Sequence, residues 1–229
     1  MSVEPEAAPR IAVLDYGMGN LRSVEKAIER AGGDPVITYD AEVIHDAHGI
    51  VLPGVGAFPR AMSRIHELGL DLVVFGRLQA GVPVLGICLG HQLVFESSAE
   101  LDGATGLGLF EGTVTALEAP GLKVPHIGWE PVRWTGESAL SAGIPDGTPF
   151  YFVHGFVPRP AHEEDVIGVA EHGEVFACAV ARHPAYGVQF HPEKSSAAGL
   201  RLLANFARIC GGPPPTGRES EDAGGLISS

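Results

Sequence analysis

The chain has 229 residues, 45% of them hydrophobic, and this content predicts one large domain with a substantial core. Its formal charge of −13 argues against a nucleic acid or an anionic membrane surface as the main partner. Its three scattered cysteines are too few for a disulfide framework or a CxxC metal site, and they favour a cytoplasmic location.

The two ends of the chain differ from its middle. Residues 1–9 are acidic and carry neither a basic segment nor a long apolar segment, so we expect a flexible arm without a secretory signal. No run of about eighteen apolar residues occurs, which argues against a transmembrane span. Residues 10–210 form the predicted single domain. Residues 211–229 have too little apolar surface to offset their ordering entropy, and we predict a disordered tail.

The first half of the chain alternates short apolar runs with amphipathic segments. Expected strands lie at 11–16, 35–39, 49–52 and 84–88. Expected helices begin at Leu21, lie between 58 and 80, and continue from 89 to 97. Such alternation predicts an α/β fold with a doubly wound, mostly parallel sheet and helices on both faces. A functional site is then expected at the carboxyl ends of the strands.

The second half consists of short apolar runs separated by glycine and proline. We predict a largely antiparallel β region folded onto the sheet. Its expected strands are 112–117, 124–126, 150–154, 165–171, 175–182 and 186–190. A helix at 197–209 closes the domain.

Cys88 lies where a central strand is expected to turn sharply into a helix. Gly86 and Gly90 flank it in a Gly-x-Cys-x-Gly pattern, the thiol counterpart of the nucleophile elbow. Residues without Cβ tolerate the crowding of such a turn. The alternative for a single cysteine is a small buried hydrophobe, and the choice depends on finding a base.

A candidate base follows another apolar strand. His191 and Glu193 are separated only by Pro192. Residues two apart in an extended segment point the same way, so the Glu193 carboxylate can orient the His191 ring. Cys88, His191 and Glu193 then fill the three roles of a nucleophilic triad.

These motifs carry a resemblance to a known family. Gly86-Ile-Cys-Leu-Gly-His-Gln92 with Gln189-Phe-His-Pro-Glu193 resembles the class I (triad) glutamine amidotransferases, which release ammonia from glutamine. Within that family the chain is similar to the glutaminase subunits of imidazole glycerol phosphate synthases of histidine biosynthesis. That narrower similarity rests on residues 14–24, 52–58, 124–129 and 151–154. It extends from about Ile11 to Cys210.

The resemblance implies the reaction and the partner. The substrate is L-glutamine, hydrolysed through a γ-glutamyl thioester without a cofactor or a metal. The partner is a (β/α)8 cyclase subunit, bound as a heterodimer, which uses the ammonia to make imidazole glycerol phosphate and AICAR. His45 and His48 have a metal-like spacing, but we interpret them as part of a solvated loop.

The resemblance also assigns residues around the triad. The oxyanion hole is the Leu89 N–H with a peptide N–H of the 53–56 loop, at Gly54 or Val55. Glutamine is held by the following residues: Gly54, Gly56, Gln92, Glu100, and the backbone of His154, Gly155 and Phe156. Considered without the resemblance, the loop is equally a tight turn, and Gln92 and Glu100 are exposed helix and loop residues. His154-Gly-Phe156 stands where the family usually has His-Ser-Tyr.

A further group is assigned to the face that meets the cyclase: Asn20, His126, Trp129, Tyr151 and Lys194. Without the resemblance these are a helix cap, aromatic packing residues, a loop histidine and a surface lysine. Glu130 stands where an asparagine is common in the family.

Two other functions remain open at this point. His91 gives a Gly-His-Gln sequence, as in glutaminases of the anthranilate and GMP synthases, whereas Asp15–Asn20 and Pro53-Gly-Val-Gly56 favour the histidine pathway. A non-catalytic redox or chaperone-like protein on the same scaffold would keep Cys88 as a sensor and lack a base beside it.

Overall fold

A computed structural model describes residues 8–211 of the chain. Most of the expected arm at 1–9 and of the expected tail at 211–229 therefore lies outside the described residues. Gly211 is the exception in the tail, because it ends the last helix.

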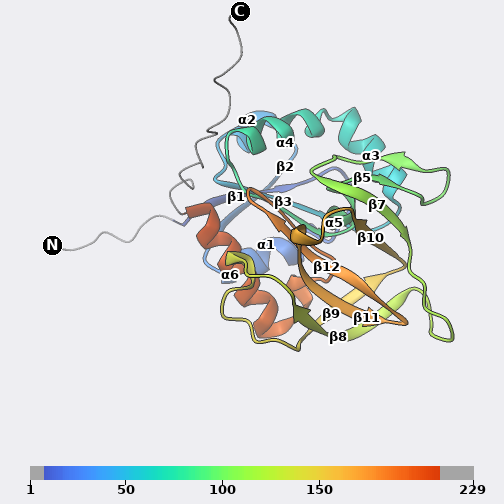
Figure 1. The fold of residues 1–229 in the computed structure, drawn as a ribbon. Helices are drawn as coiled ribbons and strands as arrows, with labels where there is room; N and C mark the ends of the chain where they lie inside the picture. The colour runs from blue at the N-terminus through green and yellow to red at the C-terminus, as the bar shows by residue number, and fades with distance from the viewer. Residues whose placement is uncertain (1–7, 212–229) are drawn as a thin grey trace, which may run out of the picture.

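Parallel strands form one half of a nine-stranded sheet (Figure 1). They follow the order β2-β1-β3-β4-β13. Their bounds are Asp34–Thr38 (β2), Arg10–Leu14 (β1), Gly49–Gly54 (β3), Val84–Cys88 (β4) and Ala185–Val188 (β13). Strand β4 lies between β3 and β13, so Cys88 ends a central strand, as expected.

Most of the expected antiparallel strands continue this sheet rather than fold onto it, so that part of the expectation is wrong for them, whereas the strand expected at 112–117 lies in a separate sheet. Strand β13 pairs with β4 on one side and with β12 on the other, and the sheet proceeds as β12-β11-β8-β9. The bounds are Glu174–Arg182 (β12), Val166–His172 (β11), His126–Trp134 (β8) and Thr148–His154 (β9). Strand β13 joins the two halves because its open edge accepts an antiparallel hairpin partner.

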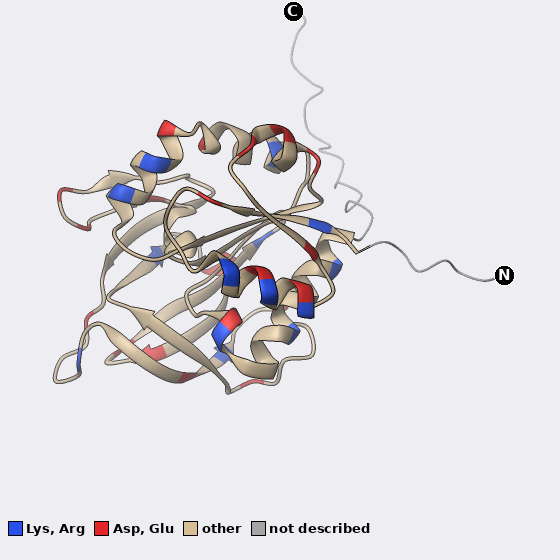
Figure 2. Ribbon diagram, turned by 180° about the vertical axis from the view of Figure 1, so that it is seen from behind, with Lys and Arg blue, Asp and Glu red and all other residues tan. Residues whose placement is uncertain are grey.

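Helices cover both faces of the parallel half, as the alternating pattern predicted (Figure 1). Helices α1 (Leu21–Arg30) and α6 (Ser196–Gly211) pack on one face with Ile11 and Val13 of β1. The other face carries α2 (Ala41–His45), α3 (Phe58–Glu67) and α4 (Leu70–Gln79), packed with Ala12 and Leu14. The period-2 alternation of β1 therefore serves two separate core clusters. Lys, Arg, Asp and Glu lie on the helices and also on the strands and the loops (Figure 2).

The helix expected at 89–97 is too long. Helix α5 (Leu89–Leu93) is one short turn, and strand β5 (Phe95–Ser98) follows it. The fully buried Phe95 ring lies 5.7 Å from Phe110, so burial in a second sheet overrides helix continuation. That four-stranded sheet has the order β10-β7-β5-β6, with β10 Phe156–Pro160, β7 Phe110–Ala116 and β6 Ala104–Thr105.

Short helical turns complete the fold. The 3₁₀ turns are η1 (Ala139–Ser141), η2 (Glu163–Asp165) and η3 (Pro192–Lys194). The segment around His45, expected as a loop, contains helix α2, which Asp40 caps by accepting the Glu42 N–H at 2.8 Å. Within residues 8–211, no helix is long and apolar enough to cross a membrane.

Candidate active site

The turn between β4 and α5 has the strained geometry of a nucleophile elbow. Cys88 has φ 55° and ψ −106°, an unfavourable backbone for a residue with a side chain. A Cβ on Gly86 would lie 2.4 Å from the Gly90 carbonyl oxygen, and one on Gly90 would lie 1.7 Å from that of Leu52. Both glycines are therefore required by the close approach of backbones around Cys88, as the sequence pattern predicted.

The structure brings His191 and Glu193 to this cysteine. His191 follows β13, the strand next to β4, and its N–H donates to the Tyr151 carbonyl at 2.9 Å. Its Nδ1 lies 2.8 Å from Glu193 Oε1, in a pair whose side chains are only 5% and 3% exposed. His191 and Cys88 line the same cavity, and Cys88 is close enough to raise the pKa of the imidazole, while Cys88 Sγ itself lies 3.6 Å from the Val153 carbonyl oxygen. Sulfur, imidazole and carboxylate thus lie in sequence, the arrangement that activates a nucleophile.

This arrangement changes the protonation of His191. Burial by itself lowers the pKa of the imidazole, but hydrogen bonds to Cys88 and to Glu193 outweigh it and raise the pKa to about 10. A protonated imidazole between two groups that can carry negative charge favours the thiolate–imidazolium pair. That pair is the reactive form of a catalytic cysteine.

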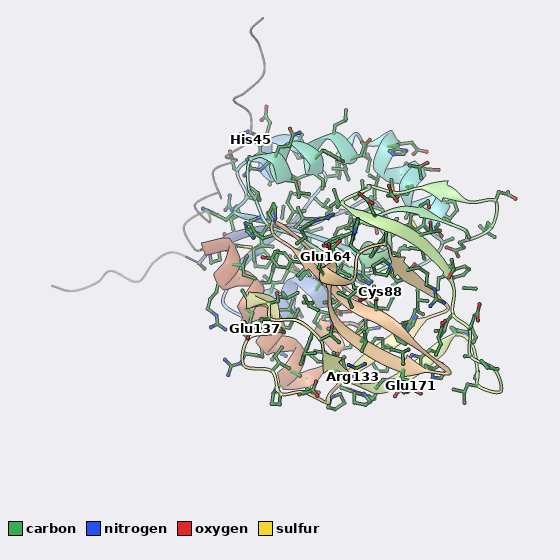
Figure 3. All side chains as sticks on the ribbon, viewed as in Figure 1. His45, Cys88, Arg133, Glu137, Glu164 and Glu171 are labelled. Atoms are coloured by element: carbon green, nitrogen blue, oxygen red, sulfur yellow. The ribbon has the colours of Figure 1, made fainter. Side chains whose placement is uncertain are left out.

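A small cavity opens over the triad. Its volume is about 200 Å³, below the range of roughly 300–1,000 Å³ of drug-sized ligand pockets, so it suits a small substrate. The cavity is lined by Cys88, His191, Val55 and Leu89. All the predicted glutamine ligands except Gly54 also line it: Gly56, Gln92, Glu100, His154, Gly155 and Phe156. The label on Cys88 marks this region near the middle of the molecule in Figure 3.

A hydrogen bond from Tyr16 fixes the first residues of the 53–56 loop. The phenol donates to the Pro53 carbonyl at 2.5 Å, and a Cβ on Gly54 would lie 2.2 Å from the Tyr16 oxygen. Beyond this anchor, Val55 is 47% exposed and Gly56 has φ +107°. The loop is therefore anchored at Pro53 and Gly54 and exposed at Val55. Tyr16 was not predicted as part of the site, although it lies at the carboxyl end of the first strand.

Two buried amides support the cysteine. Gln92 Nε2 donates to the Phe156 carbonyl at 3.0 Å and to Gln189 Oε1 at 3.2 Å. Gln189 is fully buried, and its Nε2 lies 3.9 Å from Cys88 Sγ. Gln92 thus ties α5 to β10 within the protein. Gln189 was not predicted from the sequence, although a glutamine two residues before His191 in an apolar strand marks the same face.

Glu100 has one oxygen engaged in the protein. Its Oε2 accepts the Phe58 N–H at 2.8 Å and so caps α3, whose N-cap residue Ala57 has no side chain able to do so. The same carboxylate lines the cavity, where it offers a negative group to a substrate ammonium.

Three of the predicted interface residues lie together beside the cavity. The Trp129 and Tyr151 rings are 5.8 Å apart, and Lys194 Nζ lies 5.8 Å from the Tyr151 ring centre. Lys194 also lines the cavity. Trp129 and Tyr151 face each other on paired strands β8 and β9. Asn20 is exposed before α1, without a side-chain cap bond to the helix.

His126 lies elsewhere than the other predicted interface residues. Positions 126 and 129 of β8 have opposite parity, so their side chains leave opposite faces of the strand. His126 is 2% exposed and contacts His154 and His172, whereas Trp129 is 49% exposed.

Comparisons with known proteins agree with this geometry. The family model described as "Glutamine amidotransferase class-I" matches residues 12–210. The chain belongs to the class I glutamine amidotransferase family. Within this family it is 49% identical over 199 residues to the imidazole glycerol phosphate synthase subunit HisH of Moorella thermoacetica, covering 87% of this chain and 94% of the relative. The same subunit of Bacillus cereus strain AH187 is 44% identical with equal coverage.

Solved structures show the same amidotransferase fold. A putative GMP synthase subunit from Thermoplasma acidophilum superposes with a TM-score of 0.69 at 19% identity, covering 89% of this chain and 94% of that one. A structure described as a glutamine amidotransferase has a TM-score of 0.69 at 22% identity, with coverage of 88% and 98%. The fold class expected from the sequence, a doubly wound α/β domain, is confirmed.

Proposed function

We propose that this chain is the glutaminase subunit of an imidazole glycerol phosphate synthase and that Cys88, His191 and Glu193 are its catalytic triad. The observation that carries the proposal is the His191 ring, which lies 2.8 Å from Glu193 and lines one small cavity together with Cys88. The relatives named as HisH subunits, at 44–49% identity over most of the chain, support the pathway.

The chemistry follows from the three side chains. The Cys88 thiolate attacks the side-chain amide carbon of glutamine, and a C–S bond forms as the carbonyl oxygen becomes an oxyanion. His191 gives its proton to the amide nitrogen, the C–N bond breaks, and ammonia leaves a γ-glutamyl thioester. Neutral His191 then takes a proton from water, whose oxygen attacks the thioester carbon. The C–S bond breaks to release glutamate and regenerate the pair.

The oxyanion requires donors beside Cys88. Leu89 N–H is in the first turn of α5, where helix N–H groups have no intrahelical acceptor. The second donor is a peptide N–H at Gly54 or Val55 of the 53–56 loop. The low steric cost at Gly54 and Gly56 allows this peptide to turn when a partner docks. Glu100 would receive the substrate ammonium, and the backbone at 154–156 its carboxylate.

Ammonia released into bulk water becomes ammonium, which is not nucleophilic. The proposal therefore includes a (β/α)8 cyclase subunit docked over the site as the partner of a heterodimer, which uses the ammonia to form imidazole glycerol phosphate and AICAR. The surface formed by Trp129, Tyr151 and Lys194 adjoins the cavity and is our candidate for part of this interface. We also propose a cytoplasmic location, which the three free cysteines of the described residues support.

The test measures glutamate release by the chain with and without the cyclase, and synthesis by the complex from glutamine or from ammonium salt. Cys88→Ala should abolish glutamine hydrolysis and glutamine-dependent synthesis and retain ammonium-dependent synthesis. Cys210→Ala, in the last helix, serves as the control that retains both. Glutamine hydrolysis by Cys88→Ala would refute the triad. Stable capture of an anthranilate or GMP synthase component instead of the cyclase would refute the pathway.

A further inference from the structure

A second cluster of ligand-type side chains lies outside the triad. His126 and Glu130 are on the same face of β8, and His172 ends β11, the neighbouring strand in the sheet. His126 Nε2 lies 3.4 Å from Glu130 Oε1, and His172 Nδ1 lies 3.9 Å from the same oxygen. These three atoms all lie within 4.8 Å of one another.

Hydrogen bonds at the second nitrogen of each imidazole ring determine which nitrogen atoms keep a lone pair for a ligand. His172 Nε2 is 3.0 Å from the Lys123 carbonyl, so it carries the proton and leaves Nδ1 as a lone pair. His154 Nδ1 is 3.0 Å from the Phe156 carbonyl, so its Nε2 must accept. His126 Nδ1, at 3.3 Å, therefore donates to it. His126 Nε2 is then also a lone pair.

The result is a site with acceptors and no donor. His126 is 2% exposed, and its Nε2 has no hydrogen-bond partner. Two imidazole lone pairs and one carboxylate therefore converge on side chains that are 2%, 15% and 29% exposed, and an acceptor set of this kind attracts a cation.

We propose that His126, Glu130 and His172 form a binding site for a divalent transition metal ion, with Zn²⁺ as the favoured occupant. Two histidine nitrogens and one carboxylate oxygen are a common zinc ligand set with a fourth position left open. Tetrahedral ligands at about 2.0–2.2 Å from an ion are roughly 3.3–3.6 Å apart, close to the separations found here. The His126 and His172 rings are stacked with centres 4.0 Å apart, and both must turn out of this stack for their lone pairs to point at one ion.

The surroundings support this assignment. The Lys123 carbonyl and His154 hold the outer nitrogens of the two rings, as outer-shell groups do in metal sites. A hollow of about 560 Å³ reaches Glu130 and His172 from the surface and gives an ion and a water ligand access. Arg133 and Glu171, which border this hollow, lie at the edge of the molecule away from Cys88 (Figure 3). The sequence did not predict this site because the proposed ligands come from β8 and β11, two strands that are distant along the chain.

The experiment titrates the full chain with Zn²⁺ and with Co²⁺ in the Cys88→Ala background, which removes the thiol as a competing ligand. Calorimetry should give one site per chain, and Co²⁺ should give ligand-field absorption without a sulfur-to-metal band. Glu130→Gln and His172→Phe should each weaken binding at least tenfold, and Phe keeps the ring stacking on His126. The matched control is His162→Phe, which removes a surface histidine paired with Glu111 at 3.0 Å.

Thermal unfolding of each variant with EDTA checks that it folds. Added Zn²⁺ should raise the midpoint of the Cys88→Ala chain and of its His162→Phe variant but not of the Glu130→Gln variant. Equal binding by all variants would overturn the proposal, because it would show that the metal binds to surface histidines and not to this cluster. The absence of Zn²⁺ and Co²⁺ binding by the Cys88→Ala chain would also overturn it.

Discussion

His191 Nδ1 and Glu193 Oε1 lie 2.8 Å apart, in a side-chain pair almost fully withdrawn from solvent. Glu193→Gln keeps the shape but removes the charge that orients the ring and stabilises the imidazolium. We expect kcat for glutamine hydrolysis in the cyclase complex to fall by about 10²- to 10³-fold. The pKa of His191, measured by NMR, should fall as well. Ammonium-dependent synthesis is the control and should not change, whereas near-normal hydrolysis would contradict the role of Glu193.

The pair of Cys88 and His191 should make stability depend on pH. The native pKa of His191 is raised to about 10, against roughly 6.5 in an unfolded chain. This contribution to the free energy of unfolding is fully present below about pH 6.5 and is lost as the pH rises toward 10. Cys88→Ala removes one cause of the raised pKa, so its stability should decline less over that range. Urea unfolding at several pH values measures this, and parallel curves for the two proteins would contradict the assignment.

The parts of the site that depend on residues close together in the sequence could be predicted from the sequence. Gly86, Cys88 and Gly90 predict a strained turn, and the spacing of His191 and Glu193 predicts the contact between imidazole and carboxylate that the structure contains. The alternation in β1 likewise predicts a sheet covered on both faces. These features can be predicted from local spacing.

Features that depend on distant segments could not be predicted in this way. Strand β5 interrupts the expected helix because Phe95 packs on Phe110, a contact invisible to local propensity. Gln92 lines the cavity, but the bonds from its amide nitrogen to Phe156 and Gln189, far along the sequence, could not be predicted. The cluster of His126 and His172 likewise exists only because β8 and β11 are neighbours in the sheet.

The elbow glycines should be intolerant of any side chain. In Gly90→Ala the new Cβ would meet the Leu52 carbonyl oxygen at 1.7 Å, so the free energy of unfolding should fall by at least about 1–3 kcal/mol. The matched control is Gly76→Ala in α4, where nothing lies within 4 Å of the added Cβ. That variant should gain about 0.5–1 kcal/mol from the helix preference of alanine. Urea unfolding compares the two, and an equally stable Gly90→Ala protein would contradict the close approach at the elbow.

Trp129 offers a test of the docking surface. It is 49% exposed and packs edge-on against Tyr151 beside the cavity. Aromatic residues at the centre of an interface commonly contribute about 2 kcal/mol or more. Trp129→Ala should therefore raise the Kd for the cyclase at least about tenfold, measured by calorimetry. Leu72→Ala is the control on α4, where that leucine is 76% exposed. An equal effect of both substitutions, or of neither, would contradict this surface.

His91 is a buried titratable group that the triad does not use. Its ring is fully buried edge-on against Phe95, and although the Ala177 backbone is near, neither nitrogen makes a hydrogen bond of ordinary geometry. Burial lowers the pKa of His91 to about 3. Since the unfolded value is roughly 6.5, stability is lost as the pH falls from there toward 3.

His91→Leu keeps the bulk of the side chain, removes the unpaired nitrogens and cannot take up a proton. The variant should be more stable than the parent at pH 7, by about 1 kcal/mol, and the advantage should grow as the pH is lowered to 4. His45→Leu is the control, because His45 is exposed at the top of the molecule (Figure 3). Urea unfolding at pH 7, 5.5 and 4 measures both variants. An advantage of His91→Leu that stays constant with pH would mean that the buried ring is not the group responsible for the acid sensitivity.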